Sequence, residues 1–323
     1  MKAIVQDRFG SADVLELRDV PEPVVGDDQV LVSVRAAGCG PDVWHIMAGK
    51  PYMVRPIPEV RRAMKAPRGR DVAGVIERVG AAVTGFAPGD EVIGVVEGSF
   101  AEFVAGSPAK LARKPAALSW EEAGALPISG VTALQALRDA AEVQPGQRVL
   151  IVGAGGGVGT FAVQIAKALG AHVTGVCSGA KADLVHSLGA DDVIDYTRED
   201  FTDGARRWDV IVDTAGRRPL RKLRRALTPK GTLVIVGGDG GGRWTGGFGR
   251  QMLRAPLLSL LTGQRLRPVL AEGNHDDLEI LAKMVEDGEM RPVVDRTFAL
   301  PDAAEAIRYL ERGHAAGKVV VTA

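Results

Sequence analysis

Hydrophobic and polar residues alternate with a period of two in the first third of the chain. Residues 30–35, for example, place Val30, Val32 and Val34 on one face of an extended segment. Turn residues separate such segments. The pattern predicts a β-rich part with strands at residues 1–8, 14–20, 30–35, 71–79, 91–96 and 100–104. Residues 36–69 follow neither period and are expected to form a long functional loop.

From Ser119 onward the apolar residues follow a helical spacing. Ser119 and Glu122 form a capping-box pattern, with a hydroxyl at the cap and a carboxylate three residues later. Strands and helices then alternate. Strands are expected at residues 149–152, 172–177, 193–195, 209–213, 232–236 and 266–271, and helices near 158–169, 181–188, 219–227 and 276–286. Six strands with helical crossovers predict an α/β fold with a doubly wound parallel sheet.

The last part of the chain returns to a β-rich pattern. Strands are expected at residues 293–298 and 318–322, with a helix at 302–310 between them. A nucleotide-binding domain is therefore expected to be inserted into a second domain. The predicted boundaries are 1–118 and 289–323 for a substrate domain and 119–288 for the nucleotide-binding domain.

A glycine loop follows the first strand of the alternating part. It runs from Gly153 to Gly159, and a helix and a second strand follow it. Glycines allow a backbone to approach a pyrophosphate closely, and the start of a helix offers unpaired N–H groups. The order of strand, loop, helix and strand predicts dinucleotide binding by Gly153, Gly156, Gly157, Val158 and Gly159. The glycine spacing fits G-x-x-G-x-x-G better than G-x-G-x-x-G.

Composition adds limits rather than a function. The 323 residues, 46% of them hydrophobic, are enough for two domains. Lys plus Arg equals Asp plus Glu at 40 each, so no overall field favours nucleic acid or anionic lipid. No apolar run approaches the roughly 18 residues of a membrane span, and residues 1–7 enter a strand pattern directly. We expect a soluble, cytoplasmic protein without nucleic-acid or membrane partners.

Several segments together resemble one family. They are GRDVAGVIERVG (69–80), FAPGDEVIG (86–94), LPISGVTALQAL (126–137), the glycine loop, LGADDVIDY (188–196), DVIVDTAG (209–216) and HAAGKVVV (314–321). The chain resembles the medium-chain dehydrogenase/reductase superfamily, in its zinc-free quinone oxidoreductase and enone reductase branch. The resemblance implies a GroES-like substrate domain, a Rossmann domain, hydride transfer in the cleft between them and a homodimer.

The chain departs from the metal-dependent members of that superfamily. Zinc-dependent alcohol dehydrogenases carry a cysteine, a Gly-His-Glu and a further cysteine as ligands. Here Cys39 aligns with the first, but the second reads Gly69-Arg70-Asp71 and residues 126–137 hold no cysteine. An arginine stays protonated and has no free lone pair for zinc, and a catalytic zinc needs three protein ligands. The sequence therefore predicts no metal site, with Cys39 as a buried thiol and His45 as a loop or pocket residue.

The residues after the second strand bear on the choice of cofactor. An NAD site places an acid about 20 residues past the glycine loop, whereas this strand is followed by Ser178 and Lys181. A hydroxyl and a cation can bind a 2′-phosphate, so we expect NADPH. The resemblance adds Tyr196 to the same pocket. It also implies cofactor contacts for Thr132, on the nicotinamide side, and for Lys318. Gly237 and Gly238 end the strand after Thr232 and are expected to let the backbone approach the nicotinamide side. Alternatively, Ser178 is a turn residue, Lys181 a surface residue and Thr132 a helix-start residue.

The expected reaction is hydride delivery from NADPH to a quinone or to the double bond of an enone or enal. Tyr52 follows the family's active-site loop and is the candidate proton donor, with a packing role or solvent protonation as alternatives. Residues 237–263 are either a flap, in which Trp244 and Phe248 line the pocket, or a surface loop followed by a core or interface helix.

Many zinc-free relatives have the sequence Asn-Pro-x-Asp in a loop that has the sequence Gly40-Pro41-Asp42-Val43 in this chain. A catalytic role for that motif is therefore in doubt. Two other functions stay open: an NADPH-binding sensor or scaffold without turnover, and a dedicated biosynthetic reductase acting on one enone or imine.

Overall fold

The computed structural model describes the chain except residues 53–54, 59–60, 62–65, 238–250, 252–253 and 260–261. It divides into two compact units. The β-rich unit consists of Met1–Val131 and Glu272–Ala323, and the parallel-sheet unit of Thr132–Ala271. Each unit has its own hydrophobic cluster.

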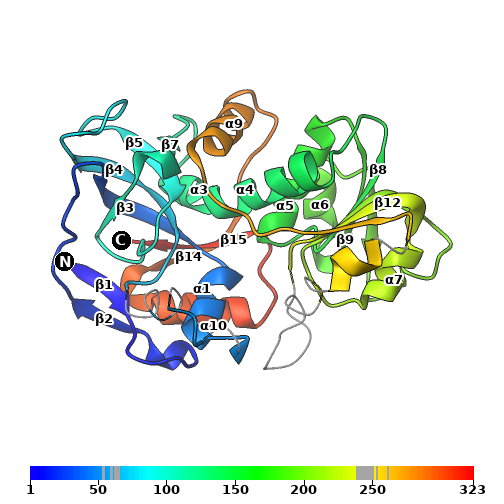
Figure 1. Ribbon diagram of the computed structural model, residues 1–323, viewed down its shortest axis with the longest axis horizontal. Helices are drawn as coiled ribbons and strands as arrows, with labels where there is room; N and C mark the ends of the chain where they lie inside the picture. Colours follow the sequence, from blue (N-terminus) through cyan, green and yellow to red (C-terminus); the bar gives the residue numbers. More distant parts are fainter. Residues whose placement is uncertain (53–54, 59–60, 62–65, 238–250, 252–253, 260–261) are drawn as a thin grey trace. The chain divides into compact units, whose positions relative to one another are not determined.

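The parallel-sheet unit is built on one six-stranded sheet (Figure 1). Its strands run in the order β10-β9-β8-β11-β12-β13, and all pairs are parallel. This is the order 3-2-1-4-5-6 of a Rossmann fold, so the switch point lies between the neighbouring strands β8 and β11. The strands are β8 (Arg148–Val152), β9 (His172–Cys177), β10 (Asp192–Asp195), β11 (Trp208–Asp213), β12 (Leu227–Ile235) and β13 (Arg265–Pro268).

Apolar side chains on both faces of these strands explain why the sheet is covered by helices. Leu150, Ile211 and Leu233 pair across three neighbouring strands on one face and are fully buried. The next residue of each strand, Ile151, Val212 and Val234, points to the other face and is also fully buried. Such continuous apolar runs are typical of parallel sheets with helices on both sides. Helix α4 (Pro127–Leu134) crosses the boundary between the two units. The helical segments within this unit include the π-helix η4 (Gln135–Ala140), α5 (Gly157–Ala168), the 3-10 turn η5 (Gly179–Lys181), α6 (Ala182–Ser187) and α7 (Leu220–Arg225).

The β-rich unit contains a seven-stranded sheet and a separate hairpin-like pair. The large sheet runs β14-β15-β3-β4-β5-β7, and β6 pairs with β3. Its strands are β3 (Val30–Cys39), β4 (Asp71–Val79), β5 (Glu91–Val95), β6 (Phe103–Gly106), β7 (Leu111–Arg113), β14 (Val294–Ala299) and β15 (Lys318–Thr322), and β1 (Lys2–Val5) pairs with β2 (Glu16–Asp19). The large sheet therefore joins strands from residues 30–113 with the last two strands of the chain, β14 and β15.

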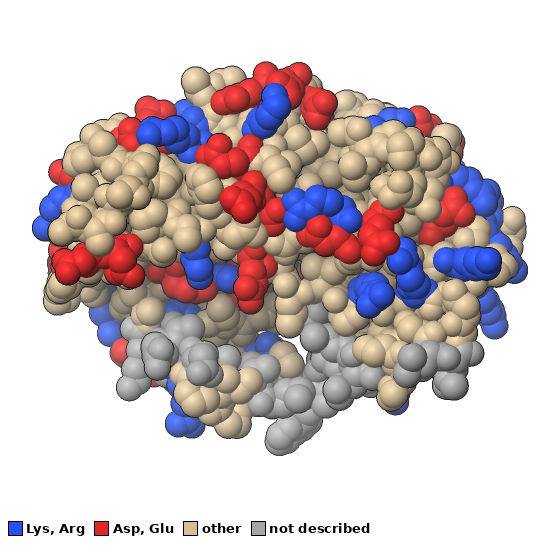
Figure 2. All heavy atoms as spheres, turned by 45° about the horizontal axis from the view of Figure 1, so that its top comes forward, with Lys and Arg blue, Asp and Glu red and all other residues tan. Residues whose placement is uncertain are grey.

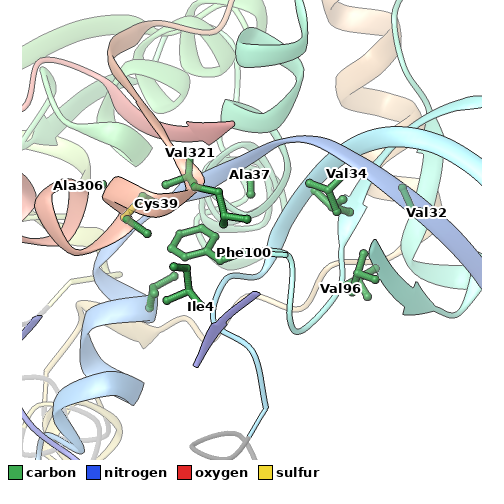
Figure 3. Close-up of a cluster of buried hydrophobic side chains, with 14 of the residues drawn as sticks. Ile4, Val32, Val34, Ala37, Cys39, Val96, Phe100, Ala306 and Val321 are labelled. Carbon is green, nitrogen blue, oxygen red and sulfur yellow. The ribbon is translucent and has the colours of Figure 1, made fainter. Parts of the chain in front are cut away.

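The core of the β-rich unit forms around Phe100. Its ring is fully buried, and Figure 3 shows it lying between Ile4 and Val321 with Cys39 close by. Helices α1 (Pro41–Ala48) and α10 (Ala303–Glu311) add Met47 and Ile307 to this cluster. The short turns η1 (Ala12–Val14), η3 (Pro108–Lys110) and η6 (Leu300–Asp302) connect the strands.

The units divide the chain at different points from the boundaries expected from sequence. Helices α3 (Trp120–Ala125) and α9 (His275–Glu286) belong to the β-rich unit, because α3 packs on β3 and β4 and α9 packs on β5 and β7. The change of pattern at Ser119 marks the start of a helix, with the expected capping box present, rather than a change of unit.

The expectation of a loop over residues 36–69 was wrong in its first part. Strand β3 continues to Cys39, and residues Pro41–Ala48 form α1. The local sequence explains the helix: Pro41 occupies a first-turn position and Gly49 ends it with a positive φ of 56°. Of residues 237–263, those at 254–259 are helical, whereas Gly238, Trp244 and Phe248 lie outside the described residues.

Candidate functional site

The glycine loop lies between the carboxyl end of β8 and the start of α5. Gly153 has a φ of 86°, which disfavours other residues, and its carbonyl accepts the N–H of Gly156 at 3.0 Å. Gly156 caps α5. A Cβ on Gly159 would overlap the carbonyl oxygen of Gly153, so this glycine lets the helix pack on the turn. The loop brings Gly153, Gly156, Gly157, Val158 and Gly159 to a helix N-terminus, a favourable site for an anion.

The turn that follows β9, residues Ser178–Lys181, lies beside the glycine loop. Ser178 precedes η5, which ends at Lys181. A Cβ on Gly155 would come within 2.8 Å of the Lys181 side chain, so the stem of Lys181 crosses the loop. Tyr196 donates its backbone N–H to Cys177 at 3.1 Å and is 47% exposed. The structure thus brings the predicted residues Ser178, Lys181 and Tyr196 together at the ends of β9 and β10.

An acid that sequence reasoning missed lies in the same place. Asp195 ends β10, and its carboxylate accepts hydrogen bonds from the backbone N–H and the hydroxyl of Thr197, at 3.0 and 2.7 Å. These bonds, with smaller help from Gly179, hold the pKa of Asp195 below its ordinary value. The sequence rule for cofactor choice considers only the residues at the end of the second strand, β9. Asp195 instead comes from the third strand, β10.

The carboxyl ends of β11 and β12 lie next to the glycine loop, at the same end of the parallel strands. Asp213 is fully buried, and its carboxylate accepts the N–H groups of Ala215 and Gly216. A Cβ on Gly237 would overlap the carbonyl oxygen of Thr214, so the two chain segments touch through their backbones. Thr132 lies inside α4 and is half-buried, rather than at a helix start.

The β-rich unit holds a buried ion pair. The ammonium of Lys318 donates to Asp71 at 2.9 Å, and the N–H of Ile128 donates to the other carboxylate oxygen at 2.6 Å. Burial alone would lower the pKa of Lys318, but the attraction of Asp71 and Asp42 leaves it raised. The predicted cofactor contact of Lys318 stays a prediction, and the structure gives its ammonium a partner within the β-rich unit.

The residues aligned with zinc ligands form a different kind of cluster. The Arg70 guanidinium lies 2.8 Å from the Glu97 carboxylate and 3.8 Å from that of Asp42. Cys39 is 1% exposed, and burial raises the pKa of its thiol. A protonated thiol, a guanidinium and a carboxylate already bound to an ammonium do not fit a zinc site. Among the described residues, no group of three or more His, Cys, Asp or Glu side chains is arranged for a metal.

The candidate proton donor Tyr52 is held by an arginine. The guanidinium of Arg55 lies 4.2 Å from the centre of the Tyr52 ring and 5.1 Å from that of Phe9. Arg55 also donates to the carbonyl oxygens of Gly49 and Ala48, at 2.9 and 3.1 Å. Tyr52 is half-buried, so the end of α1 fixes an aromatic phenol in a cationic environment.

The face of the molecule in Figure 2 carries charges of both signs. Figure 2 shows Lys and Arg side chains interspersed with Asp and Glu on the face displayed, as expected from the equal numbers in the sequence. The helices of the described residues are too short or too polar to cross a membrane.

Comparisons with known proteins identify the class. Residues 26–187 match the alcohol dehydrogenase GroES-like domain, and residues 188–321 match a zinc-binding dehydrogenase domain. The chain is 31% identical to a chloroplast envelope quinone oxidoreductase homolog of Arabidopsis thaliana, over 97% of this chain and 95% of that protein. It is 34% identical to a 2-methylene-furan-3-one reductase of Solanum lycopersicum, over 99% of this chain and 79% of that protein.

A solved structure agrees with these matches. The quinone oxidoreductase from Coxiella burnetii superposes with a TM-score of 0.88 at 31% identity, covering 100% of this chain and 99% of that one. These relatives support an oxidoreductase that uses a nicotinamide cofactor. The chain belongs to the medium-chain dehydrogenase/reductase superfamily, in its quinone oxidoreductase-like branch.

Proposed function

We propose that the protein is an NADPH-dependent, zinc-independent reductase that acts on a quinone or on the double bond of an α,β-unsaturated carbonyl. The observation that carries this proposal is the cluster at the aligned metal position. Arg70 is paired with Glu97, and Asp71 is bound to Lys318, so these groups offer zinc too few free donors. A reaction that needs no Lewis acid fits this centre best. The Arabidopsis and Solanum relatives are named for quinone and enone chemistry.

The proposed preference for NADPH rests on the turn Ser178–Lys181 after β9. The start of α5 would hold the pyrophosphate, and Ser178 and Lys181 would hold the 2′-phosphate through a hydroxyl and an ammonium. Asp195 lies close by, but its carboxylate is hydrogen-bonded to Thr197 and the Gly179 backbone. These bonds direct the oxygens of Asp195 toward Thr197 and the Gly179 backbone.

In the proposed mechanism the chain binds, orients and supplies a proton. When bound, NADPH supplies the hydride that saturates the β-carbon of the acceptor, and an oxyanion forms at the acceptor's carbonyl oxygen. Tyr52 would then deliver its phenolic proton to the α-carbon. Its ring is fixed by Arg55, whose guanidinium lies 4.2 Å from the ring centre. Solvent protonation is the competing route, since an enolate needs no dedicated acid.

Anaerobic mixing of the metal-stripped protein with NADPH and a panel of quinones, enals and enones tests the proposal. We expect loss of the 340-nm absorbance of NADPH with at least one acceptor, unchanged by added zinc, and slower with NADH. A Gly159→Ala variant serves as the control, because its Cβ would overlap the carbonyl oxygen of Gly153 and distort the glycine loop. Tight NADPH binding without turnover would instead favour a sensor or scaffold, and activity restricted to one enone or imine would favour a biosynthetic reductase.

A homodimer is part of the same proposal. Among the described strands, β13 is the last of the six-stranded sheet, and such an edge strand can pair with a second copy. Light scattering measures the mass directly, and a monomer would remove this part of the proposal. The cytoplasmic location stays a prediction, and the Arabidopsis relative is named for the chloroplast envelope.

A further inference from the structure

Three arginines of α7 line one surface cavity of the parallel-sheet unit. The cavity has a volume of about 390 Å³, and its wall includes Arg221, Arg224 and Arg225. Their spacing of three and four residues places them on one side of the helix. Leu223 of the same helix is fully buried, so the arginines occupy the side away from the core.

No carboxylate among the described residues forms an ion pair with the arginines of this cavity. On the same helix, Lys222 lies 3.2 Å from Asp200, and the preceding Arg218 lies 3.7 Å from the same carboxylate. Within the part of the chain that the structure describes, Arg221, Arg224 and Arg225 have no ion pair of this kind. Like charges at this spacing oppose helix formation, and the negative end of the helix dipole offsets only part of that repulsion.

One of the three guanidinium groups is held in place by the opposite wall. The side-chain oxygen of Gln264 accepts a hydrogen bond from Nε of Arg224 at 2.9 Å. The amide nitrogen of Gln264 donates to the carbonyl oxygens of Arg224 and Thr228, at 2.9 and 3.3 Å. Gln264 therefore fixes both the backbone and the Nε group of Arg224, which presents the rest of the guanidinium in a defined orientation.

The cavity lies at the amino ends of the parallel strands, and the cofactor residues lie at their carboxyl ends. Leu227 begins β12 and Arg265 begins β13, and the cavity residues Arg225 and Gln264 directly flank these two starts. The glycine loop and Gly237 instead follow the carboxyl ends of β8 and β12. Because all six strands are parallel, the cavity and the cofactor residues lie at opposite ends of the strands.

We propose that this cavity is a second anion site, which binds the diphosphate group of a small molecule. Guanidinium groups form paired hydrogen bonds with phosphoryl oxygens, and three of them match an anion with several charges. The volume falls within the range of roughly 300–1,000 Å³ that is usual for small-ligand sites. This site is independent of the proposed reductase activity.

Titration calorimetry of the full chain with inorganic diphosphate and with ADP, in excess NADPH, tests the proposal. We expect both probes to bind, and the double variant Arg221→Gln/Arg225→Gln to weaken binding by about tenfold or more. Arg35→Gln makes the same type of substitution once, on an exposed strand residue of the β-rich unit, and should leave binding unchanged. Ser178→Ala/Lys181→Ala should also leave it unchanged, which separates this site from the cofactor site.

Each outcome bears on the proposal. Tighter binding of ADP than of inorganic diphosphate would show that a nucleoside adds contacts, and equal affinities that only the phosphates are recognised, and both support the site. Failure of both probes to bind, or equal loss in Arg35→Gln, would overturn it. Binding of a short RNA strand but of neither probe would overturn it as well, in favour of a nucleic-acid surface. Unchanged NADPH binding by the double variant shows that it is folded.

Discussion

Lys318 and Asp71 form a buried ion pair across a strand that separates them. Lys318 begins β15 and Asp71 begins β4, and both strands pair with β3. The two side chains are only 4% and 2% exposed. A Cβ on Gly38 of β3 would overlap the Asp71 carboxylate, so the pair needs a glycine at this point of β3.

Asp71→Asn should destabilise the protein strongly. The substitution leaves the ammonium of Lys318 buried beside a neutral amide, and removal of one partner of such a pair costs about 3–5 kcal/mol. Urea unfolding followed by circular dichroism measures the change. Asp19→Asn is the matched control, because the Lys2–Asp19 pair has a 2.6 Å separation but side chains that are 49% and 76% exposed. It should cost less than about 1 kcal/mol, and similar losses in both variants would contradict the assignment.

Cys39 should make the protein less stable at alkaline pH. Burial raises the pKa of its thiol, with Lys318 opposing, so the folded state keeps the proton that the unfolded chain releases above about pH 8.5. The stabilisation is complete below that pH and declines as the pH rises, by up to about 1.4 kcal/mol per pH unit for one group. Cys39→Ala should remove this part of the slope in unfolding experiments between about pH 8 and 10. Identical slopes in wild type and variant would disprove the expectation.

Gly159→Ala should disturb the glycine loop more than Gly156→Ala. The first variant forces its Cβ onto the Gly153 carbonyl, and overpacking of this kind costs about 1–3 kcal/mol. At Gly156 the nearest atom to a Cβ is 3.3 Å away and the φ is −101°, so the fold should tolerate alanine. Thermal unfolding gives the stabilities, and a larger loss at Gly156 would contradict this geometry.

The double variant Ser178→Ala/Lys181→Ala should weaken NADPH much more than NADH. The two side chains contact only the extra phosphate in the proposed complex, and two charge-assisted hydrogen bonds correspond to about a hundredfold in affinity. Fluorescence titration with each cofactor measures the ratio. Equal losses for the two cofactors would remove the assignment. Asp195→Asn provides a second readout, because removal of a nearby negative charge should tighten NADPH and leave NADH nearly unchanged.

Tyr52→Phe should lower kcat by about a hundredfold and leave KM nearly unchanged, if the phenol donates the proton. Turnover of an enal by wild type and variant across a range of pH measures the effect. Tyr309→Phe is the control, since that hydroxyl is bound to Asp295 at 2.7 Å on another part of the β-rich unit. An unchanged kcat in Tyr52→Phe would assign protonation to solvent.

Local patterns were enough to predict most of the fold. The alternation of strands and helices gave the six parallel strands because each strand is a short apolar run bounded by turn residues, and β15 was expected at the residues where it lies. The missed helix α1 carries its own signals, Pro41 at the start and Gly49 at the end. They were overlooked because the surrounding residues follow no clear period.

The candidate site was predictable only where it is local in sequence. The glycine loop and Ser178 lie within one strand–helix–strand segment, and the structure brings them together. Asp195 was missed because its proximity to Gly179 depends on the pairing of β9 with β10. The partners Asp71 and Lys318 are separated by 247 residues, so only the assembled sheet shows why each is tolerated in the core.

Strand β15 lies between β14 and β3, so the sheet of the β-rich unit cannot close before residues Lys318–Thr322 have been synthesised. Until then Asp71, near the start of the chain, has no cation to neutralise it. The parallel-sheet unit is one continuous stretch, Thr132–Ala271, and can fold on the ribosome without that wait. The order of folding can therefore differ from the order of synthesis. The parallel-sheet unit can fold before the β-rich unit, which needs the last strand of the chain.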